Sequence, residues 1–226
     1  MRVISCMVHD HNLVFVLMAA LLCLSGSLVA STLIRRTFLE DGMAKAHWCF
    51  LSAVTAGAAT WATHFIAMLG YAYEIERGLS LARTVGSLAL ACVLFAFSVV
   101  PVMRGYGCQR CRIVAAAALT VSIGSMHYVG MSAYEASALL VWDRGMVAVS
   151  FVLGFVFNLA SVQLFTTKRS SGRLIVCPIL FVLAICAIHF LGMAALTVVP
   201  LDTSVGAWSG NSTVLAAGTL VTSLRS

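Results

Sequence analysis

The stretch Met126-His127-Tyr128-Val129-Gly130-Met131 lies at the end of a long apolar run, and it has two counterparts elsewhere in the chain. Residues 63–68 read THFIAM and residues 188–193 read IHFLGM, so His, aromatic, small and Met positions recur in the same order. The first and second histidines are 63 residues apart, and the second and third are 62 apart. So constant a spacing indicates an internal repeat, with each unit spanning a pair of apolar runs.

The composition indicates a membrane protein. Of the 226 residues, 61% are hydrophobic and 10% are charged, whereas a soluble domain carries roughly 25% charged residues. The apolar runs have about the 20 residues that a helix needs to cross a bilayer. Backbone polar groups in lipid must be satisfied within such a segment, so we expect an all-α fold. Six clear runs and a weaker seventh lie at about 12–34, 47–70, 81–103, 111–133, 145–167, 174–197 and 207–224.

Pairs of these runs make up the repeat. The sequence predicts a membrane domain over 1–200, with two-helix repeats at about 12–70, 81–133 and 145–197, and a seventh helix within 201–226 that leads to the cytoplasm. Each repeat crosses the membrane an even number of times, so the repeats are parallel and related by an axis along the membrane normal. The three motifs then lie at one depth, and their histidines can converge on that axis.

The basic residues set the expected orientation. Ten of the fourteen Lys and Arg residues follow the first, third, fifth or seventh run. Cytoplasmic loops carry such an excess of basic residues, so we predict an N-terminus outside and a C-terminus in the cytoplasm. The motifs then lie just inside the outer face. The net charge of +6 reflects topology, and we expect no direct binding of nucleic acid.

The His and Met residues of the motif form a candidate metal site. Residues i and i+4 share one helix face, so an imidazole and the thioether one turn later can point to the same centre. Thioether sulfur selects Cu(I) and imidazole suits copper, zinc and iron, whereas Mg²⁺ and Ca²⁺ want oxygen ligands. The simpler interpretations are a His bonded to a neighbouring helix and a Met that fills gaps. The predicted ligands are His64, His127, His189, Met68, Met131 and Met193.

Further residues can contribute to this site. His9 and His11 precede the first helix and can cap the site from above, although a solvated tail near lipid headgroups is the simpler interpretation. Met126 is another possible ligand. We expect the aromatic residues at i+1 beside the site or at the membrane interface, and the small residues at i+3 at helix contacts. The aromatic residues are Phe65, Tyr128 and Phe190, and the small residues are Ala67, Gly130 and Gly192. At Gly192 we expect chiefly plain helix packing.

Two features lie outside the motif. Cys108 and Cys111 form a CxxC pair in a cytoplasmic loop. A zinc site normally needs a second ligand pair, and the sequence offers no obvious one, so we expect a structural or incidental role. Asn158 lies in the middle of the fifth run, where we expect it to bond a neighbouring helix.

The three motifs, together with His9-Asp10-His11-Asn12-Leu13, resemble the MHYT family of bacterial membrane sensor domains over essentially the whole chain. The resemblance implies six or seven helices in the bacterial cytoplasmic membrane, copper near the outer face, and sensing of oxygen, carbon monoxide, nitric oxide or redox state. It also implies a cytoplasmic output partner, in cis or in trans, for cyclic-di-GMP turnover or transcription control, and allows a homodimer. Thr63 and Ile188 depart from the family pattern, which has Met before His. No output domain follows Ser226, so we expect a longer signalling protein.

Two other functions use the same histidines. In a haem-binding membrane redox protein, two of them ligate one iron, although three at equal depth fit a single small centre better. Zinc is a further alternative. A transporter needs polar residues at several depths, and the inner halves of the motif helices are nearly apolar. The membrane runs contain no carboxylate pair and no nucleophile beside a base, so we expect no enzyme activity in this domain.

Overall fold

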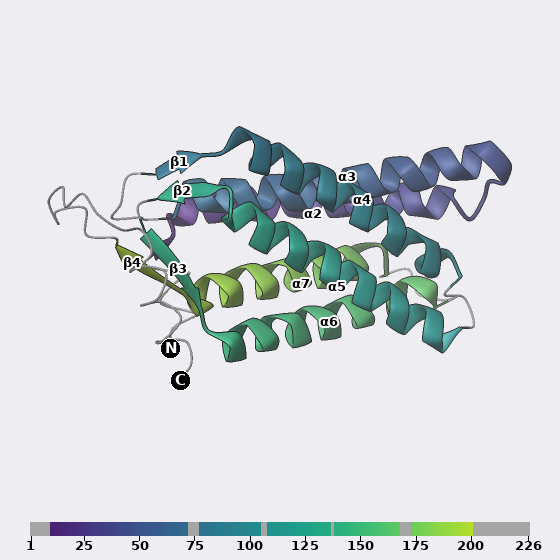
Figure 1. The fold of residues 1–226 in the computed structure, drawn as a ribbon. Coiled ribbons are helices and arrows are strands. Elements are labelled where there is room, and N and C mark those ends of the chain that lie inside the picture. The colour runs from purple at the N-terminus through teal and green to yellow at the C-terminus, as the bar shows by residue number, and fades with distance from the viewer. Residues whose placement is uncertain (1–9, 72–76, 105–107, 137, 168–172, 201–226) are drawn as a thin grey trace, which may run out of the picture.

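Six long helices account for most of the computed structural model (Figure 1), which describes residues 10–71, 77–104, 108–136, 138–167 and 173–200. All six are long and apolar enough to cross a membrane, so the chain is a multi-pass membrane protein. They confirm the first six predicted runs to within a few residues, while the predicted seventh lies outside the described residues. The helices are α2 (Leu13–Arg36), α3 (Gly42–Leu69), α4 (Leu81–Met103), α5 (Gln109–Met131), α6 (Arg144–Thr166) and α7 (Arg173–Ala195).

Polar residues start several of these helices. The Asn12 side chain accepts a hydrogen bond from the backbone N–H of Val14, and Asp143 accepts one from Met146. Such caps satisfy backbone donors that have no partner inside the helix. Both of these helices, α2 and α6, are the first helix of a helical hairpin.

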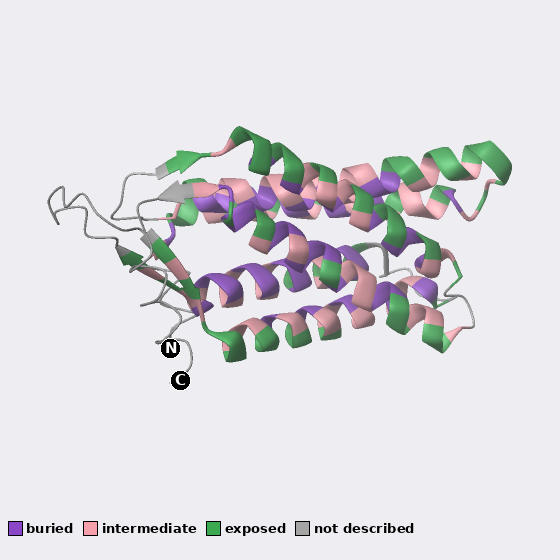
Figure 2. Ribbon diagram, in the orientation of Figure 1, coloured by how far each residue is buried: buried purple, intermediate pink, exposed green. Residues whose placement is uncertain are grey.

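The helices form three hairpins, α2–α3, α4–α5 and α6–α7, each packed along its length. The second helices contact one another inside the bundle, α3 with α5 and α5 with α7, and α2 packs on α7 to close the bundle. Buried residues gather on the faces that the helices turn toward one another (Figure 2). Large apolar side chains such as Leu17, Leu21 and Phe97 remain exposed on the outer faces, as a lipid-facing surface requires.

Short strands, which no pattern in the sequence predicts, join the hairpins at one end of the bundle. β1 (Arg77–Leu79) pairs antiparallel with β2 (Tyr134–Ala136), and β3 (Ala138–Trp142) pairs with β4 (Leu196–Pro200). An isolated bridge joins His11 to Tyr71. These pairs satisfy backbone groups in the connections after α3, α5 and α7 and tie each repeat to the next. We call this the strand end, and the opposite end, with the connections after α2, α4 and α6, the loop end.

Close helix contacts depend on small residues. At Gly57 in α3, an added Cβ would lie 2.9 Å from the backbone N and Cα of Cys92 in α4. The main apolar core runs along the same interior and includes Phe95, Ile123 and Ile188. In lipid, where apolar surfaces gain little from leaving the solvent, such backbone proximity and van der Waals packing hold helices together.

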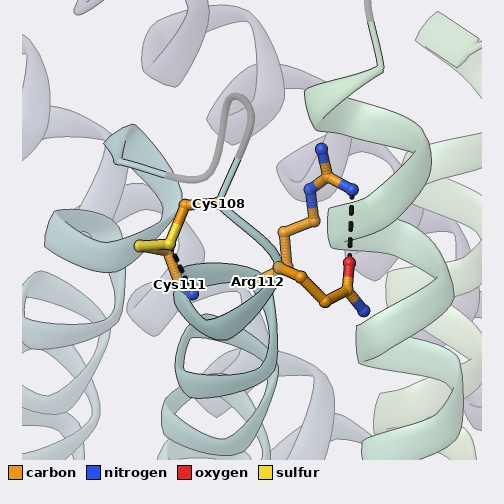
Figure 3. The surroundings of a disulfide bond; sticks show 4 residues. Cys108, Cys111 and Arg112 are labelled. Atoms are coloured by element: carbon orange, nitrogen blue, oxygen red, sulfur yellow. Dashed lines mark hydrogen bonds between the residues drawn. A yellow bond between two sulfur atoms is a disulfide. The ribbon is translucent and has the colours of Figure 1, made fainter.

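The CxxC pair lies at the loop end, where Cys108 and Cys111 form a disulfide at the start of α5 (Figure 3). The Cys108 Sγ also accepts a hydrogen bond of 3.1 Å from the backbone N–H of Cys111. Beside it, the Arg112 side chain donates to Gln109. The pair therefore closes the first turn of the helix.

A hydrogen bond between two buried side chains joins α6 to α5. The Asn158 amide in α6 donates to the Thr120 hydroxyl in α5 at 3.0 Å, and both residues are buried. This bond confirms the prediction that Asn158 bonds a neighbouring helix. Bonds of this kind between membrane helices contribute about 0.6 kcal/mol on average and up to about 1.7 kcal/mol.

A double-mutant cycle with Asn158→Leu and Thr120→Val should give a coupling free energy of about 0.6–1.7 kcal/mol, measured by unfolding in detergent micelles. The coupling arises because only the protein with both side chains makes the bond. A coupling of zero would show that the bond contributes nothing to the packing of α5 on α6.

Candidate metal centre

The three motif histidines lie in the last turns of α3, α5 and α7, and all point into the bundle. His64, His127 and His189 are 2%, 1% and 7% exposed. The helices that carry them all end at the strand end, so the histidines share one level. The parallel hairpins thus bring together three side chains that are more than sixty residues apart in sequence.

The imidazole rings face one another through their Nδ1 atoms. The His64 Nδ1 lies 3.3 Å from the Nδ1 of His127 and 3.3 Å from the Nδ1 of His189. One ring nitrogen from each residue lies within 4.8 Å of the other two. The rings are close to perpendicular, with interplanar angles of 75–84°. Within the described part of the chain, this is the only group of three or more His, Cys, Asp or Glu residues placed to share a metal ion.

This geometry fits a small metal ion. Imidazole nitrogens bind metals such as zinc at about 2.0–2.1 Å, and at a tetrahedral angle two such nitrogens lie about 3.3–3.4 Å apart. Without a metal, facing Nδ1 atoms compete, because each pair can share only one proton. The Nε2 atoms of the same three rings are buried and make no hydrogen bond to the described residues. A cation between the Nδ1 atoms would give their lone pairs a common partner.

Glycines make room for two of the rings. An added Cβ at Gly130 in α5 would lie 2.8 Å from the His64 Nε2, and one at Gly192 in α7 would lie 2.5 Å from the His127 Nε2. Each of these histidines therefore packs on the small residue of the following repeat. Gly192 lies at a helix contact, as expected, and the side chain that it contacts in α5 is the His127 ring.

The aromatic residues of the motif pack beside the histidines. The ring centroids of His64 and Phe65, His127 and Tyr128, and His189 and Phe190 are 4.9, 4.9 and 5.0 Å apart. Residues outside the motif extend this shell, since Tyr134 stacks on Phe65, and Trp142 meets Tyr128 edge to face at 5.0 Å. Tyr134 and Trp142 were not predicted, because their only signal in the sequence is an aromatic residue between apolar runs.

The three motif methionines form their own cluster at the strand end. Met68, Met131 and Met193 are at most 1% exposed and pack together. Partly buried side chains around them include Tyr71, Tyr134, Trp142 and Leu196. The cluster lies one helical turn beyond the histidines and separates them from the strands. Coordination by these thioethers remains a prediction.

Of the further predicted ligands, His11 lies beside the centre. It is 3% exposed, so the interpretation as a solvated tail was wrong for this residue. Its ring meets those of Tyr71, Phe190 and His189 edge to face, with centroids 4.8, 5.4 and 5.7 Å apart. Met126 is buried in the core and lines a cavity beside the histidines. His9 lies outside the described residues.

Comparison with known proteins supports this repeat. The family model described as MHYT, a bacterial signalling protein N-terminal repeat, matches residues 57–112 and 121–177, half of the chain. The chain belongs to the MHYT family. Each segment matched by the family model begins within one motif helix and ends within the next, from α3 to α5 and from α5 to α7. The matched segments are therefore offset from the two-helix repeats described above.

Two curated relatives are signalling proteins. An uncharacterised signalling protein of Caulobacter vibrioides is 33% identical over 88% of this chain and 24% of its own length. The cyclic di-GMP phosphodiesterase NbdA of Pseudomonas aeruginosa is 31% identical over 66% of this chain and 20% of its own length. The chain therefore spans about a quarter or less of these relatives. No solved structure matches it.

Replacing Gly192 by Ala should destabilise this MHYT domain by about 1–3 kcal/mol, because the new methyl group overlaps the His127 ring. Thermal unfolding in detergent micelles measures the effect. The matched control is Gly86→Ala in α4, where an added Cβ meets nothing within 4 Å. If the Gly192→Ala protein were as stable as the control, the close packing of the His127 ring on Gly192 would be contradicted.

Proposed function

We propose that this chain is the membrane sensory domain of a bacterial signalling protein, with a copper centre held by His64, His127 and His189. The centre responds to oxygen, carbon monoxide, nitric oxide or a redox change. The observation that carries the proposal is the convergence of three buried Nδ1 atoms, with two separations of 3.3 Å. We assign no catalysis to this domain, and place any enzyme activity in a cytoplasmic output partner.

The donor set favours copper among the candidate cofactors. Three imidazoles with thioethers one turn away form the soft to borderline environment that suits Cu(I), and no carboxylate joins the group within the described residues. Copper supplies a redox-active centre that can bind a diatomic ligand, whereas Zn²⁺ has no redox chemistry. Haem fits less well, because the cavity beside the histidines measures only ≈50 Å³.

Transport is the less favoured function. A second cavity of ≈100 Å³ lies in the loop-end half of the bundle, and its lining has no charged side chain. The Ser52 and Ser161 hydroxyls in that lining donate to the carbonyls of Ala30 and Cys177. These two hydroxyls therefore hydrogen-bond to neighbouring helices and do not form a series of binding sites for an ion along the bundle.

We place the strand end outside the cell and the loop end in the cytoplasm of a bacterium, with the chain in the inner membrane. The described loop-end residues include Arg35, Arg36, Lys45, Arg104 and Arg110, and the positive-inside rule assigns such an end to the cytoplasm. The copper centre then lies near the outer face, within the apolar part of the bilayer.

Each histidine belongs to a different hairpin, so a change in their spacing moves α3, α5 and α7 relative to one another. The paired strands β1–β2 and β3–β4 link the same hairpins at the strand end. Movement at the centre is therefore shared by the whole bundle and can reach the loop end as a change in helix packing. We propose that the output reads this change, as cyclic-di-GMP turnover or transcription control, in cis or in a dimer.

Copper content of the purified protein tests the proposal. Wild-type protein from copper-replete cells should contain a single copper ion per chain, and the triple variant His64→Ala/His127→Ala/His189→Ala should contain none. The reason is that the triple variant loses all three imidazole donors. The matched control is His47→Ala, which removes an exposed histidine near the start of α3 at the loop end.

Elemental analysis with an optical spectrum distinguishes the alternatives. Copper retained by a folded triple variant would place the metal elsewhere. Folded wild-type protein that contains no copper and shows a Soret band would select the haem alternative, and stoichiometric zinc without copper would select a zinc site.

A further inference from the structure

A small cavity lies directly beside the three histidines, between α2, α3, α5 and α7. Its volume is ≈50 Å³, compared with the roughly 10–15 Å³ needed to hold one water molecule. Apart from the histidines and Thr63, the wall consists of apolar side chains and two thiols. The space is large enough for a diatomic molecule and too small for a porphyrin.

The wall of the cavity is least buried at the seam between α2 and α7. Four lining residues are only half-buried, Val16 and Ala20 in α2 and Cys186 and Phe190 in α7, while every other lining residue is buried. Each pair is spaced four residues apart, so the side chains of each pair lie on one face of their helix. The partly exposed residues therefore frame one opening between the first and last described helices.

The surface around this opening is apolar. Leu17 and Leu21 in α2 are 61% and 60% exposed, and Leu183 in α7 is 41% exposed. Side chains of this kind face hydrocarbon in a membrane-spanning helix. The opening therefore faces the acyl chains of the bilayer.

The direct route from water is closed by contrast. On the strand-end side of the histidines, the buried cluster of Met68, Met131 and Met193 packs under Tyr71, Tyr134 and Trp142. His11 is buried against Tyr71 and Phe190 beside this cluster. A molecule reaching the histidines from the strand end would have to displace these side chains.

We propose that the seam between α2 and α7 is a lateral portal, through which a small uncharged diatomic gas passes from the bilayer to the three-histidine centre. The identity of the ligand rests on the proposed sensory function, whereas the portal itself rests on the cavity. Apolar gases dissolve in hydrocarbon, while ions and strongly polar molecules pay a large desolvation penalty there. The portal thus selects its ligand by solubility and size before the centre contacts it.

Xenon binding to metal-free protein tests the portal independently of copper, because dry apolar cavities bind xenon. The probe is the ¹³C-labelled methyl group of Met126, which lines the cavity, with the methyl group of Met146 in α6 as an internal reference. In wild-type protein, xenon should shift the Met126 signal saturably and leave the Met146 signal unchanged.

Two substitutions at the mouth should abolish this shift. Ala20→Phe fills the opening, and the milder Ala20→Leu serves if the larger side chain impairs folding. The matched control is Ala89→Phe, on an exposed face of α4 that does not line the cavity. A Met126 shift absent from wild-type protein, or unchanged in a folded Ala20 variant, would overturn the portal.

In Cu(I)-loaded protein, carbon monoxide rebinding after flash photolysis should be slower in Ala20→Phe than in wild type or Ala89→Phe, at equal copper content. Equal rebinding rates in all three proteins would also overturn the portal. Failure to load copper, with the xenon result intact, would instead count against the proposed function alone.

Discussion

The three imidazole rings that meet near one end of an apolar bundle constrain the rest of the structure. The His64 Nδ1 is 3.3 Å from both of its counterparts, so the three helices that carry these rings must stay at one level and at close range. Gly130 and Gly192 permit this, because any side chain there would occupy the space of a neighbouring Nε2. The Met cluster and the aromatic shell then isolate the rings from the strand end. Because the rings are buried, their nitrogen atoms gain more from a shared cation or proton, since an unsatisfied polar atom is costly in an apolar medium.

The same arrangement explains how one centre can report on the whole domain. Each of the three histidines comes from a different hairpin, and the paired strands connect these hairpins through β1–β2 and β3–β4. A cavity lined by residues of α2, α3, α5 and α7 lies against the same rings. A ligand in that cavity would contact helices of the first, second and third repeats at once. We therefore regard the centre, the cavity and the strands as one mechanical unit.

The sequence was sufficient to predict the six described helices and the meeting of the histidines, because hydrophobic run length and a 62–63-residue period are both visible in it. It could not reveal the strands, because segments such as Leu196–Pro200 merge with the apolar run before them. The burial of His11 depends on a bridge to Tyr71, sixty residues away, which no local pattern signals. The role of Gly192 was also hidden, because its contact is with a ring from another repeat.

X-ray absorption at the copper edge of Cu(I)-loaded protein tests the central claim most directly, since it reports the number and type of ligands. The account predicts three imidazole nitrogens at about 2.0 Å, with the multiple scattering typical of histidine. Any thioether would add a sulfur at a longer distance, which would decide the role of the motif methionines. A copper site with no imidazole scattering, or one unchanged after substitution of His127, would contradict a centre built from the three repeated histidines.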